Sequence, residues 1–245
     1  MPHSFATYTD ASVNAFKFNP RNQEVIEKKR EILQSISDHY NSKPASTLFV
    51  GFNPMIFGAT TQQVYVTSIS SDTKKYLDDS GIKYTYISSD DLTSESYKKK
   101  FDWVVAVDEY YTFANQEQDQ ITNINLTSTL AKKLIVTTLR DYKNQDYKDR
   151  EFSQPLAVHN QSATKLFLEY HNYDFNDKSS WKTSVYELEG TGSVMSGPYN
   201  RRSMFFKQLA KFSIDAGARD FYVHKNLMYK SLIKKNYEHV ISISF

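Results

Sequence analysis

The chain of 245 residues contains no cysteine, which excludes disulfide bonds, thiolate zinc sites, iron–sulfur clusters and a cysteine nucleophile. A protein without disulfides fits a reducing compartment. No stretch approaches the ~18 apolar residues that a membrane helix needs. The first thirty residues also lack the pattern of a signal peptide. We therefore expect a soluble, cytoplasmic protein that does not bind a membrane.

The chain also lacks an excess of charge of either sign. The net charge is +2, so nothing in the composition demands an anionic partner, and nucleic acid remains a possible but unindicated ligand. The six histidines never stand at a ligand spacing such as His-x-x-x-His, so we expect no metal. Walker loops, Gly-x-Ser-x-Gly and kinase signatures are missing as well. These absences leave a broad class of metal-free globular domains.

Glycine is scarce, with 7 residues, whereas aromatic residues make up 15% of the chain. Residues 1–20 are polar with scattered aromatic side chains, and we interpret them as an arm or lid. An amphipathic helix is predicted from Asn22 to about Tyr40. The aromatic residues of the arm are Phe5, Tyr8, Phe16 and Phe18.

Short apolar runs alternate with helical segments over the next hundred residues. This alternation predicts a doubly wound, mainly parallel sheet covered by helices on both faces. We expect one domain over 1–245, with 1–44 as an N-terminal arm and helix and 45–245 as the sheet domain. The predicted strands are 47–52, 64–69, 83–87, 101–107 and 133–138, and the predicted helices are 72–80 and 116–131.

The pattern changes after residue 139. A polar segment, 140–155, precedes two strands of a predicted hairpin, and a cluster of glycines follows in what we interpret as one loop. Arg201-Arg202 is expected to open a helix over 201–216, where it could meet a phosphate or form a surface charge pair. The remaining predictions are hairpin strands at 164–170 and 184–189, glycines 190, 192 and 197 in the loop, and final strands at 221–223 and 239–243 separated by a short helix.

The order of these features resembles the class I S-adenosylmethionine-dependent methyltransferases, over roughly residues 45–140 and again near the end of the chain. The matching features are a first strand ending at Gly51, a fourth strand reading Phe-Asp-x-Val-Val-Ala-x-Asp-Glu over 101–109, and a late helix closed by 215–218. The resemblance implies a seven-stranded, Rossmann-like sheet with an antiparallel C-terminal strand, and S-adenosylmethionine as cofactor. A vaguer similarity to uncharacterised proteins of large tailed phages implies no function.

The resemblance also assigns cofactor-binding positions. The loop after the first strand would approach the methionine part, the tip of the second would meet the ribose, and the tip of the third would recognise the adenine. The family has a tighter Gly-x-Gly spacing in the first loop and an acid at the second tip, and this chain departs at both. The corresponding residues here are Gly51, Asn53 and Gly58, then Ser68, then Asp90 or Asp91.

The fourth strand ends at Asp108-Glu109-Tyr110, where the family places groups that face the methyl donor and acceptor. Asp108 could contact the cofactor, and any of the three could orient the acceptor or take its proton. Ligands bind at this edge in open α/β sheets, and two adjacent acids are costly to bury unpaired. The alternative is that these acids stabilise the N-terminus of a helix.

The polar segment 140–155 follows a central strand and would lie over the crevice at the carboxyl ends of the strands, where Asp108-Glu109-Tyr110 is also expected. Long loops without secondary structure are uncommon in compact domains and are often functional. Its alternative is a solvated or partner-contacting helix. The candidate substrate-binding residues are Asp141, Lys143, Asn144 and Arg150.

Each cofactor position also has a purely structural interpretation. Gly51 and Gly58 could serve an ordinary strand-to-helix turn, and Asp90 and Asp91 could cap a turn. Two main functions therefore stay open, with a nucleotide-binding protein that uses another ligand as a third possibility. One is methyl transfer from S-adenosylmethionine to an unknown acceptor; the other is a catalytically inactive binding module in a protein assembly, such as a viral transcription apparatus or particle. If Pro54, Met55 and Phe57 fill the methionine pocket, the module is favoured; if they pack away from it, the enzyme stays possible.

Overall fold

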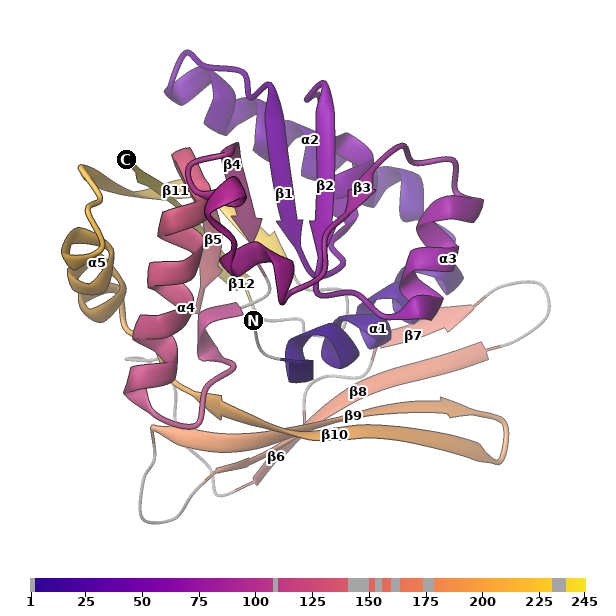
Figure 1. The fold of residues 1–245 in the computed structure, drawn as a ribbon. Coiled ribbons are helices and arrows are strands. Elements are labelled where there is room, and N and C mark those ends of the chain that lie inside the picture. Colours follow the sequence, from indigo (N-terminus) through magenta and orange to yellow (C-terminus); the bar gives the residue numbers. More distant parts are fainter. Residues whose placement is uncertain are drawn as a thin grey trace.

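The chain folds into a seven-stranded sheet with helices on both faces and a second, five-stranded sheet beneath one edge (Figure 1). Within the described residues, no helix combines the length and apolar character needed to cross a membrane. The computed structural model describes residues 3–107, 110–140, 150–152, 156–159, 164–173, 179–230 and 237–245.

The main sheet confirms the predicted fold class. Its order is β11-β12-β5-β4-β1-β2-β3. The pairs from β3 to β5 are parallel, and β12 runs antiparallel to both of its neighbours. The strands are β1 (Ser46–Val50), β2 (Gln63–Thr67), β3 (Thr85–Tyr86), β4 (Phe101–Ala106), β5 (Ala131–Leu139), β11 (Asp220–Lys230) and β12 (Tyr237–Ser244).

Successive residues of the central strands point to opposite faces of the sheet, and both faces are apolar. In β1, Leu48 packs into one cluster and Phe49 into the other. Helices α4 and α5 cover the first face, and α2 and α3 cover the second. This double burial explains why these strands read as nearly continuous apolar runs. The helices are α2 (Asn22–His39), α3 (Ser71–Asp79), α4 (Glu117–Leu130) and α5 (Phe206–Asp215).

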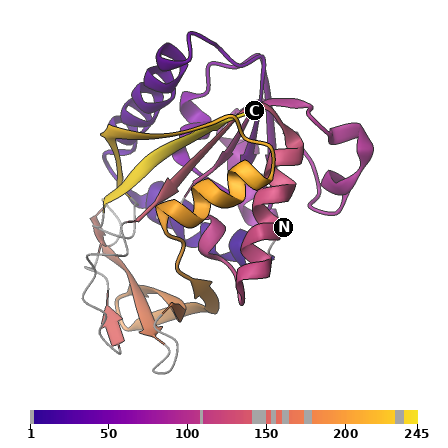
Figure 2. The ribbon, with the colours of Figure 1, turned by 90° about the vertical axis from the view of Figure 1, so that its left-hand side faces the viewer.

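The second sheet is antiparallel, with the order β10-β9-β8-β6 and β7 also paired with β8. It lies below the carboxyl ends of the parallel strands, as Figures 1 and 2 show from two directions. Alternate residues of β8 are buried, among them Glu169 and His171, so the face toward the main sheet is partly polar. The strands are β6 (Arg150–Phe152), β7 (Leu156–His159), β8 (Thr164–Tyr173), β9 (Ser180–Glu189) and β10 (Gly192–Arg202).

The interpretation of residues 1–20 as an arm did not anticipate a buried helix. Helix α1 (His3–Phe18) lies between the parallel strands and the second sheet, where it contacts α3 and β7 to β10. Phe5, Tyr8 and Phe16 are each 2% exposed or less. These side chains lie on one face of the helix, and polar residues separate them in the sequence. The segment as a whole therefore looks polar, and its burial was not predicted.

Four other sequence predictions need correction. Segment 140–155 is not one loop, because residues 150–152 form β6; residues 141–149 and 153–155 lie outside the described residues. Gly192 and Gly197 belong to β10 rather than to a loop. Helix α5 begins at Phe206, so Arg201-Arg202 ends a strand, and Arg201 is buried. The predicted helix after residue 223 is also wrong over 224–230, which continue β11.

We predict a pH dependence of stability from His224, which packs between β12 and the end of α2. Burial, and then the nearby His39, lower the pKa of His224 to about 4. The unfolded chain, with its ordinary pKa of about 6.5, therefore binds the proton more readily. The stabilising contribution is complete above pH ~6.5 and is lost as the pH falls toward ~4.

Urea unfolding should show that this residue removes about 1 to 2 kcal/mol of the free energy of unfolding between pH ~7 and ~5. His224→Gln should flatten that part of the pH profile. Equal slopes in the variant and the native protein would contradict the assignment.

Candidate functional site

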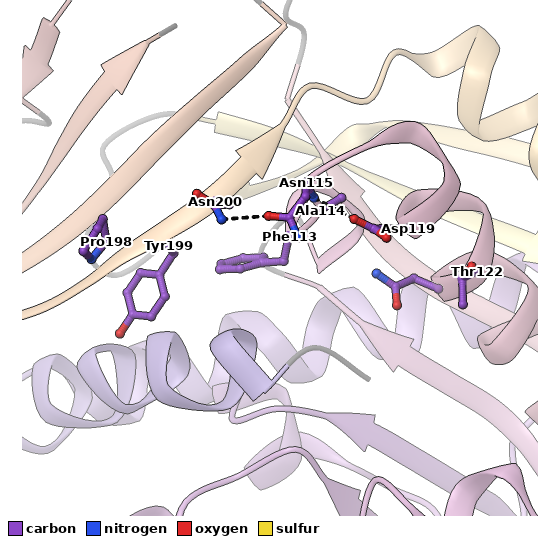
Figure 3. A pocket seen from close by; sticks show the side chains of 9 residues that line it. Phe113, Ala114, Asn115, Asp119, Thr122, Pro198, Tyr199 and Asn200 are labelled. Carbon is purple, nitrogen blue, oxygen red and sulfur yellow. Dashed lines mark hydrogen bonds between the residues drawn. The ribbon is translucent and has the colours of Figure 1, made fainter.

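Two cavities lie beside the segment that follows β4. The first, which we call the α4 cavity, has a volume of about 350 Å³ and is lined from α4 by Asp119 and Thr122, which Figure 3 labels, and by Asn123. The second, the β9 cavity, has a volume of about 370 Å³ and includes Trp181. Asn200 Nδ2 donates to Asn115 Oδ1 at 2.7 Å, and both of these residues line both cavities. Among the predicted cofactor residues that the structure describes, none lines either cavity.

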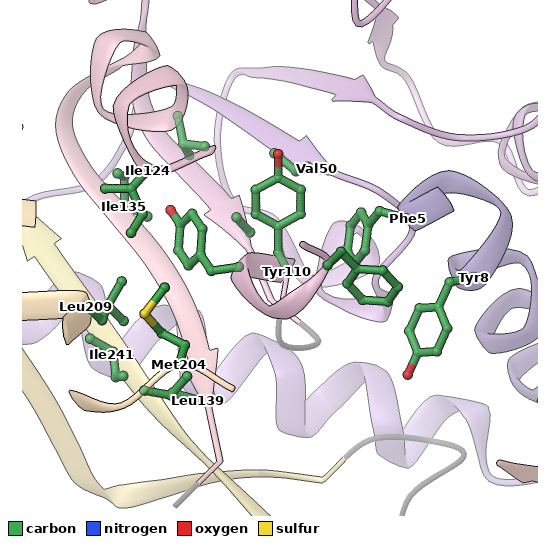
Figure 4. Packing of buried hydrophobic residues seen from close by; sticks show 14 of the residues in the cluster. Phe5, Tyr8, Val50, Tyr110, Ile124, Ile135, Leu139, Met204, Leu209 and Ile241 are labelled. Atoms are coloured by element: carbon green, nitrogen blue, oxygen red, sulfur yellow. The ribbon is translucent and has the colours of Figure 1, made fainter. Parts of the chain in front are cut away.

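The turn after β1 requires glycine for two reasons. Gly51 has a φ of +73°, in the left-handed region, and its amide donates to the carbonyl oxygen of Thr67 at 2.9 Å. A Cβ on Gly51 would lie 2.6 Å from Cε1 of Phe5. The ring of Phe5 thus packs on the glycine backbone at the point where the resemblance expects the methionine part of a cofactor (Figure 4).

The rest of the loop turns toward α2. Asn53 Oδ1 accepts from the amide of Met55 at 2.9 Å and begins the short 3-10 helix η1 (Pro54–Gly58). Met55 belongs to the cluster on the α2 face, and a Cβ on Gly58 would lie 3.0 Å from the backbone of Arg30. The loop therefore does not cover Gly51. The connection between β1 and β2 contains the short 3-10 helix η1 and no α-helix. The turn at Gly51 is therefore not followed by the N-terminus of an α-helix.

The tip of β2 carries hydroxyl groups, and its carboxylate comes from α1. Ser68 has a φ of +54°, and its Oγ lies 3.1 Å from the Oγ of Ser89. Asp10 of α1 accepts from the hydroxyls of Ser70 and Thr73, at 2.7 and 2.5 Å. These residues form the N-terminus of α3, where a negative charge is favourable. Asp10 therefore supplies a charge that the second strand lacks.

The acids after β3 are exposed turn residues. Asp91 Oδ2 accepts from the Ser88 hydroxyl at 2.8 Å, and the Ser88 hydroxyl in turn accepts from the Asp91 amide at 3.2 Å. Asp90 precedes the 3-10 helix η2 (Asp91–Thr93). Asp91 thus belongs to a local turn with Ser88, whereas the side chain of Asp90 makes no capping hydrogen bond; both residues are exposed.

The tip of β4 is described only from Tyr110 onward, because Asp108 and Glu109 lie outside the described residues. Tyr110 begins the 3-10 helix η4 (Tyr110–Thr112) and is wholly buried between Val50 and Phe5 (Figure 4). Its hydroxyl has no hydrogen-bond partner among the described residues. Burial, followed by the neighbouring Tyr111, raises the pKa of Tyr110 well above its ordinary value. In this position the phenol stays protonated, so it suits a donor rather than a base.

Three predicted substrate-binding residues, Asp141, Lys143 and Asn144, also lie outside the described residues. Arg150 belongs to β6, where it pairs with Asn172 of β8. The structure therefore brings Gly51, Ser68 and Tyr110 to one edge of the sheet under α1, while Asn53 and Gly58 serve the α2 side.

Helix α1 is also tied to the second sheet through buried polar contacts. The Tyr8 hydroxyl donates to Glu169 Oε1 at 2.6 Å, and Asn14 Nδ2 donates to Glu187 Oε2 at 3.1 Å. His171 Nε2 lies 3.4 Å from the other oxygen of Glu169. Such hydrogen bonds offset the cost of burying charged groups between two layers.

Sequence reasoning missed this interface. Its charged members, Glu169 and Arg201, lie at alternate positions of strands, a pattern that normally indicates a solvated face. The available signal was the helical spacing of Phe5 and Tyr8. Within the described ranges, no group of three or more His, Asp or Glu side chains could hold a metal ion.

Solved structures of methyltransferases share this fold. The CcbJ methyltransferase of Streptomyces caelestis is 14% identical with a TM-score of 0.63, covering 88% of each chain. S-adenosylmethionine-bound CalS10, an amino pentose methyltransferase of Micromonospora echinaspora, is 8% identical with a TM-score of 0.64, covering 89% of this chain and 91% of its own. The sugar N-methyltransferase KedS8 of a Streptoalloteichus species is 8% identical with a TM-score of 0.62, covering 89% and 87%. No protein-family model and no curated protein matches the sequence.

At these identities the likeness establishes the fold, which is that of S-adenosylmethionine-dependent methyltransferases.

We predict that replacing Gly51 by alanine destabilises the protein more than replacing a glycine that has a similar positive φ but open space around its Cα. Gly81 is the matched control, because its φ is +70° and a Cβ there would meet nothing within 4 Å. Gly81→Ala should cost about 1 kcal/mol from backbone strain. Gly51→Ala should cost about 2 to 4 kcal/mol, because the methyl group also meets Phe5.

Chemical denaturation of the two variants, Phe5→Leu and the Gly51→Ala/Phe5→Leu double variant would measure this difference. The double variant should be more stable than the sum of the single effects allows. Additive effects, or equal costs at the two glycines, would show that Phe5 does not press on Gly51.

Proposed function

We propose that the protein binds S-adenosylmethionine at the carboxyl ends of the parallel strands, in the space now filled by α1, which we call the crevice, and transfers its methyl group to a small polar acceptor. The observation that carries the proposal is the extent of the likeness, which covers about nine tenths of both chains. A doubly wound sheet alone would not suffice, because that fold hosts many functions.

The residues at the strand tips fit such a cofactor on the sheet side. Gly51 would allow close approach of the methionine part, and the hydroxyls of Ser68 and Ser89 would face the ribose. Thr67 Oγ1 and the Tyr110 hydroxyl are buried polar atoms with no hydrogen-bond partner among the described residues. Such atoms are costly to bury alone, so a polar ligand between them would be stabilised.

On its other side the crevice is filled by α1. Phe5 lies against Gly51, so the ring must move before a ligand can reach the glycine. Asp10 and Tyr8 are hydrogen-bonded on either side of the crevice and hold the helix in place. We infer that cofactor binding displaces at least the first turns of α1 from this position.

S-adenosylmethionine supplies a methyl group already activated on a sulfonium, so the protein contributes mainly positioning. Asp108 and Glu109 follow β4 and would orient the acceptor or take its proton, and Tyr110 would donate a hydrogen bond. CalS10 and KedS8 act, by their names, on an amino pentose and on a sugar nitrogen. For this chain we propose an amine on a small molecule, because both cavities beside β4 are of small-molecule size.

The contact between Phe5 and Gly51 also favours a second function. If Phe5 fills the crevice permanently, the protein is a binding module that retains the methyltransferase fold without its cofactor. The short η1 and the missing acid at the tip of β2 also favour this alternative. The two functions differ in whether α1 can be displaced by ligand.

Calorimetry with S-adenosylmethionine and S-adenosylhomocysteine tests the proposal. The native protein should bind both at micromolar concentrations. Phe5→Ala should bind about fivefold more tightly, because less binding energy is spent on displacing α1. Ile214→Ala, which removes an exposed side chain on α5, should bind like the native protein.

Circular dichroism should confirm that each variant is folded. If neither the native protein nor Phe5→Ala binds at millimolar ligand, the proposal fails and the binding module is favoured. If Phe5→Ala binds less tightly than the native protein, Phe5 is part of the site rather than its cover.

A further inference from the structure

We infer that the α4 cavity binds the hydroxyl groups of an uncharged or cationic polyhydroxylated ring. The cavity lies between the N-terminal half of α4 and β10, and its wall includes Phe113, Asn115, Asp119, Asn123 and Asn200 (Figure 3). Its volume of about 350 Å³ suits a single ring with its substituents.

Asn123 is the first reason to expect a ligand. The residue is only 6% exposed, it lines the cavity, and its side-chain amide makes no hydrogen bond with any described residue. Gln120, one turn earlier on α4, differs: its Nε2 donates to the carbonyl oxygens of Tyr111, Arg202 and Ser203. Gln120 therefore holds the surrounding segments together, whereas Asn123 presents an unused donor and acceptor to the cavity.

Charge narrows the class of ligand. Among the described residues that line the α4 cavity, Asp119 is the one that carries a charge. Its Oδ2 accepts from the backbone amides of Asn115 and Gln116, so the carboxylate is held in place. An anion would be repelled here, while a neutral or positively charged group would be accepted. The amides of Asn115, Asn123 and Asn200 can each donate and accept, which suits hydroxyl groups.

The aromatic residues exclude a flat base as the preferred ligand. Base recognition commonly uses an open aromatic face for stacking. Phe113 is 2% exposed, and the guanidinium of Arg201 lies 4.0 Å from its ring centroid. Tyr199 is 5% exposed and packs edge-on against Tyr8. With both rings occupied, recognition must come from the edges of the ligand, as it does for a ring of hydroxyl groups.

Phe113 also connects the cavity to the crevice. Its ring packs edge-on against Phe5 at 5.0 Å between centroids, so the cavity and the space under α1 share one wall. A ring held in the cavity would lie beside the crevice once α1 moves. The inference that this ring is the methyl acceptor rests on the proposed function; the binding of the ring itself does not.

Nuclear magnetic resonance without cofactor tests the binding directly. The probes are glucosamine, glucose and glucose 6-phosphate, each titrated to about 20 mM, because single-ring ligands bind at millimolar Kd. Saturation transfer from the protein should be seen for glucosamine and glucose and should be much weaker for the phosphate. The side-chain amide signals of Asn123 should shift during both effective titrations.

Asn123→Ala should raise the Kd for glucosamine about fivefold, as expected for one lost hydrogen bond. Asn125→Ala is the matched control, since Asn125 is exposed on the same helix and does not line the cavity. Its Kd should equal that of the native protein.

Absence of saturation transfer to either uncharged or cationic probe would overturn the inference and leave Asn123 a hydrated side chain. An unchanged Kd in Asn123→Ala, or preference for the phosphate, would overturn it as well. Sugar binding without cofactor binding would keep this site and remove the proposed function. Cofactor binding without sugar binding would keep the proposed function and remove this site.

Discussion

The packing of α1 between the two sheets is the contact on which the rest of the structure depends. Phe5 lies on Gly51 of the main sheet, Tyr8 donates to Glu169 of the second sheet, and Asp10 accepts from the N-terminus of α3. One helix thus joins three parts of the molecule through one apolar and two polar contacts. The same helix covers the edge where doubly wound sheets bind ligands. Stability and access to the site are therefore linked through α1.

Much of the main sheet could be predicted from sequence, because its central strands, β1, β4 and β5, are largely buried on both faces. The run at 101–107 is apolar apart from Asp102, and the run at 133–138 has an apolar centre between Lys133 and Thr137. Sheet order followed from the resemblance, since a C-terminal strand inserted antiparallel beside β5 is a property of topology and not of any local pattern. The register and the seven-stranded arrangement confirm it.

The site could be predicted less well, because its contacts join distant segments. Gly51 was identified, but nothing local indicated that Phe5 would cover it. Arg201 was expected at the start of a helix, as a phosphate contact or part of a surface charge pair; its guanidinium is instead buried against Phe113, beside α1. Asn123 belongs to a polar helix with no distinctive sequence pattern. Its amide becomes a candidate for ligand binding only because the structure places it at the α4 cavity. The strand tips were thus predictable from local patterns, whereas the helix and sheet that enclose them were not.

Amide hydrogen exchange of α1, followed by mass spectrometry with and without saturating S-adenosylhomocysteine, tests the central claim most directly. If the ligand takes the place of Phe5, peptides from 3–18 should exchange faster in its presence, while peptides from α2 should not change. Unchanged or slower exchange in α1 would contradict the account, because the helix would then be a fixed part of the fold and not a displaceable cover.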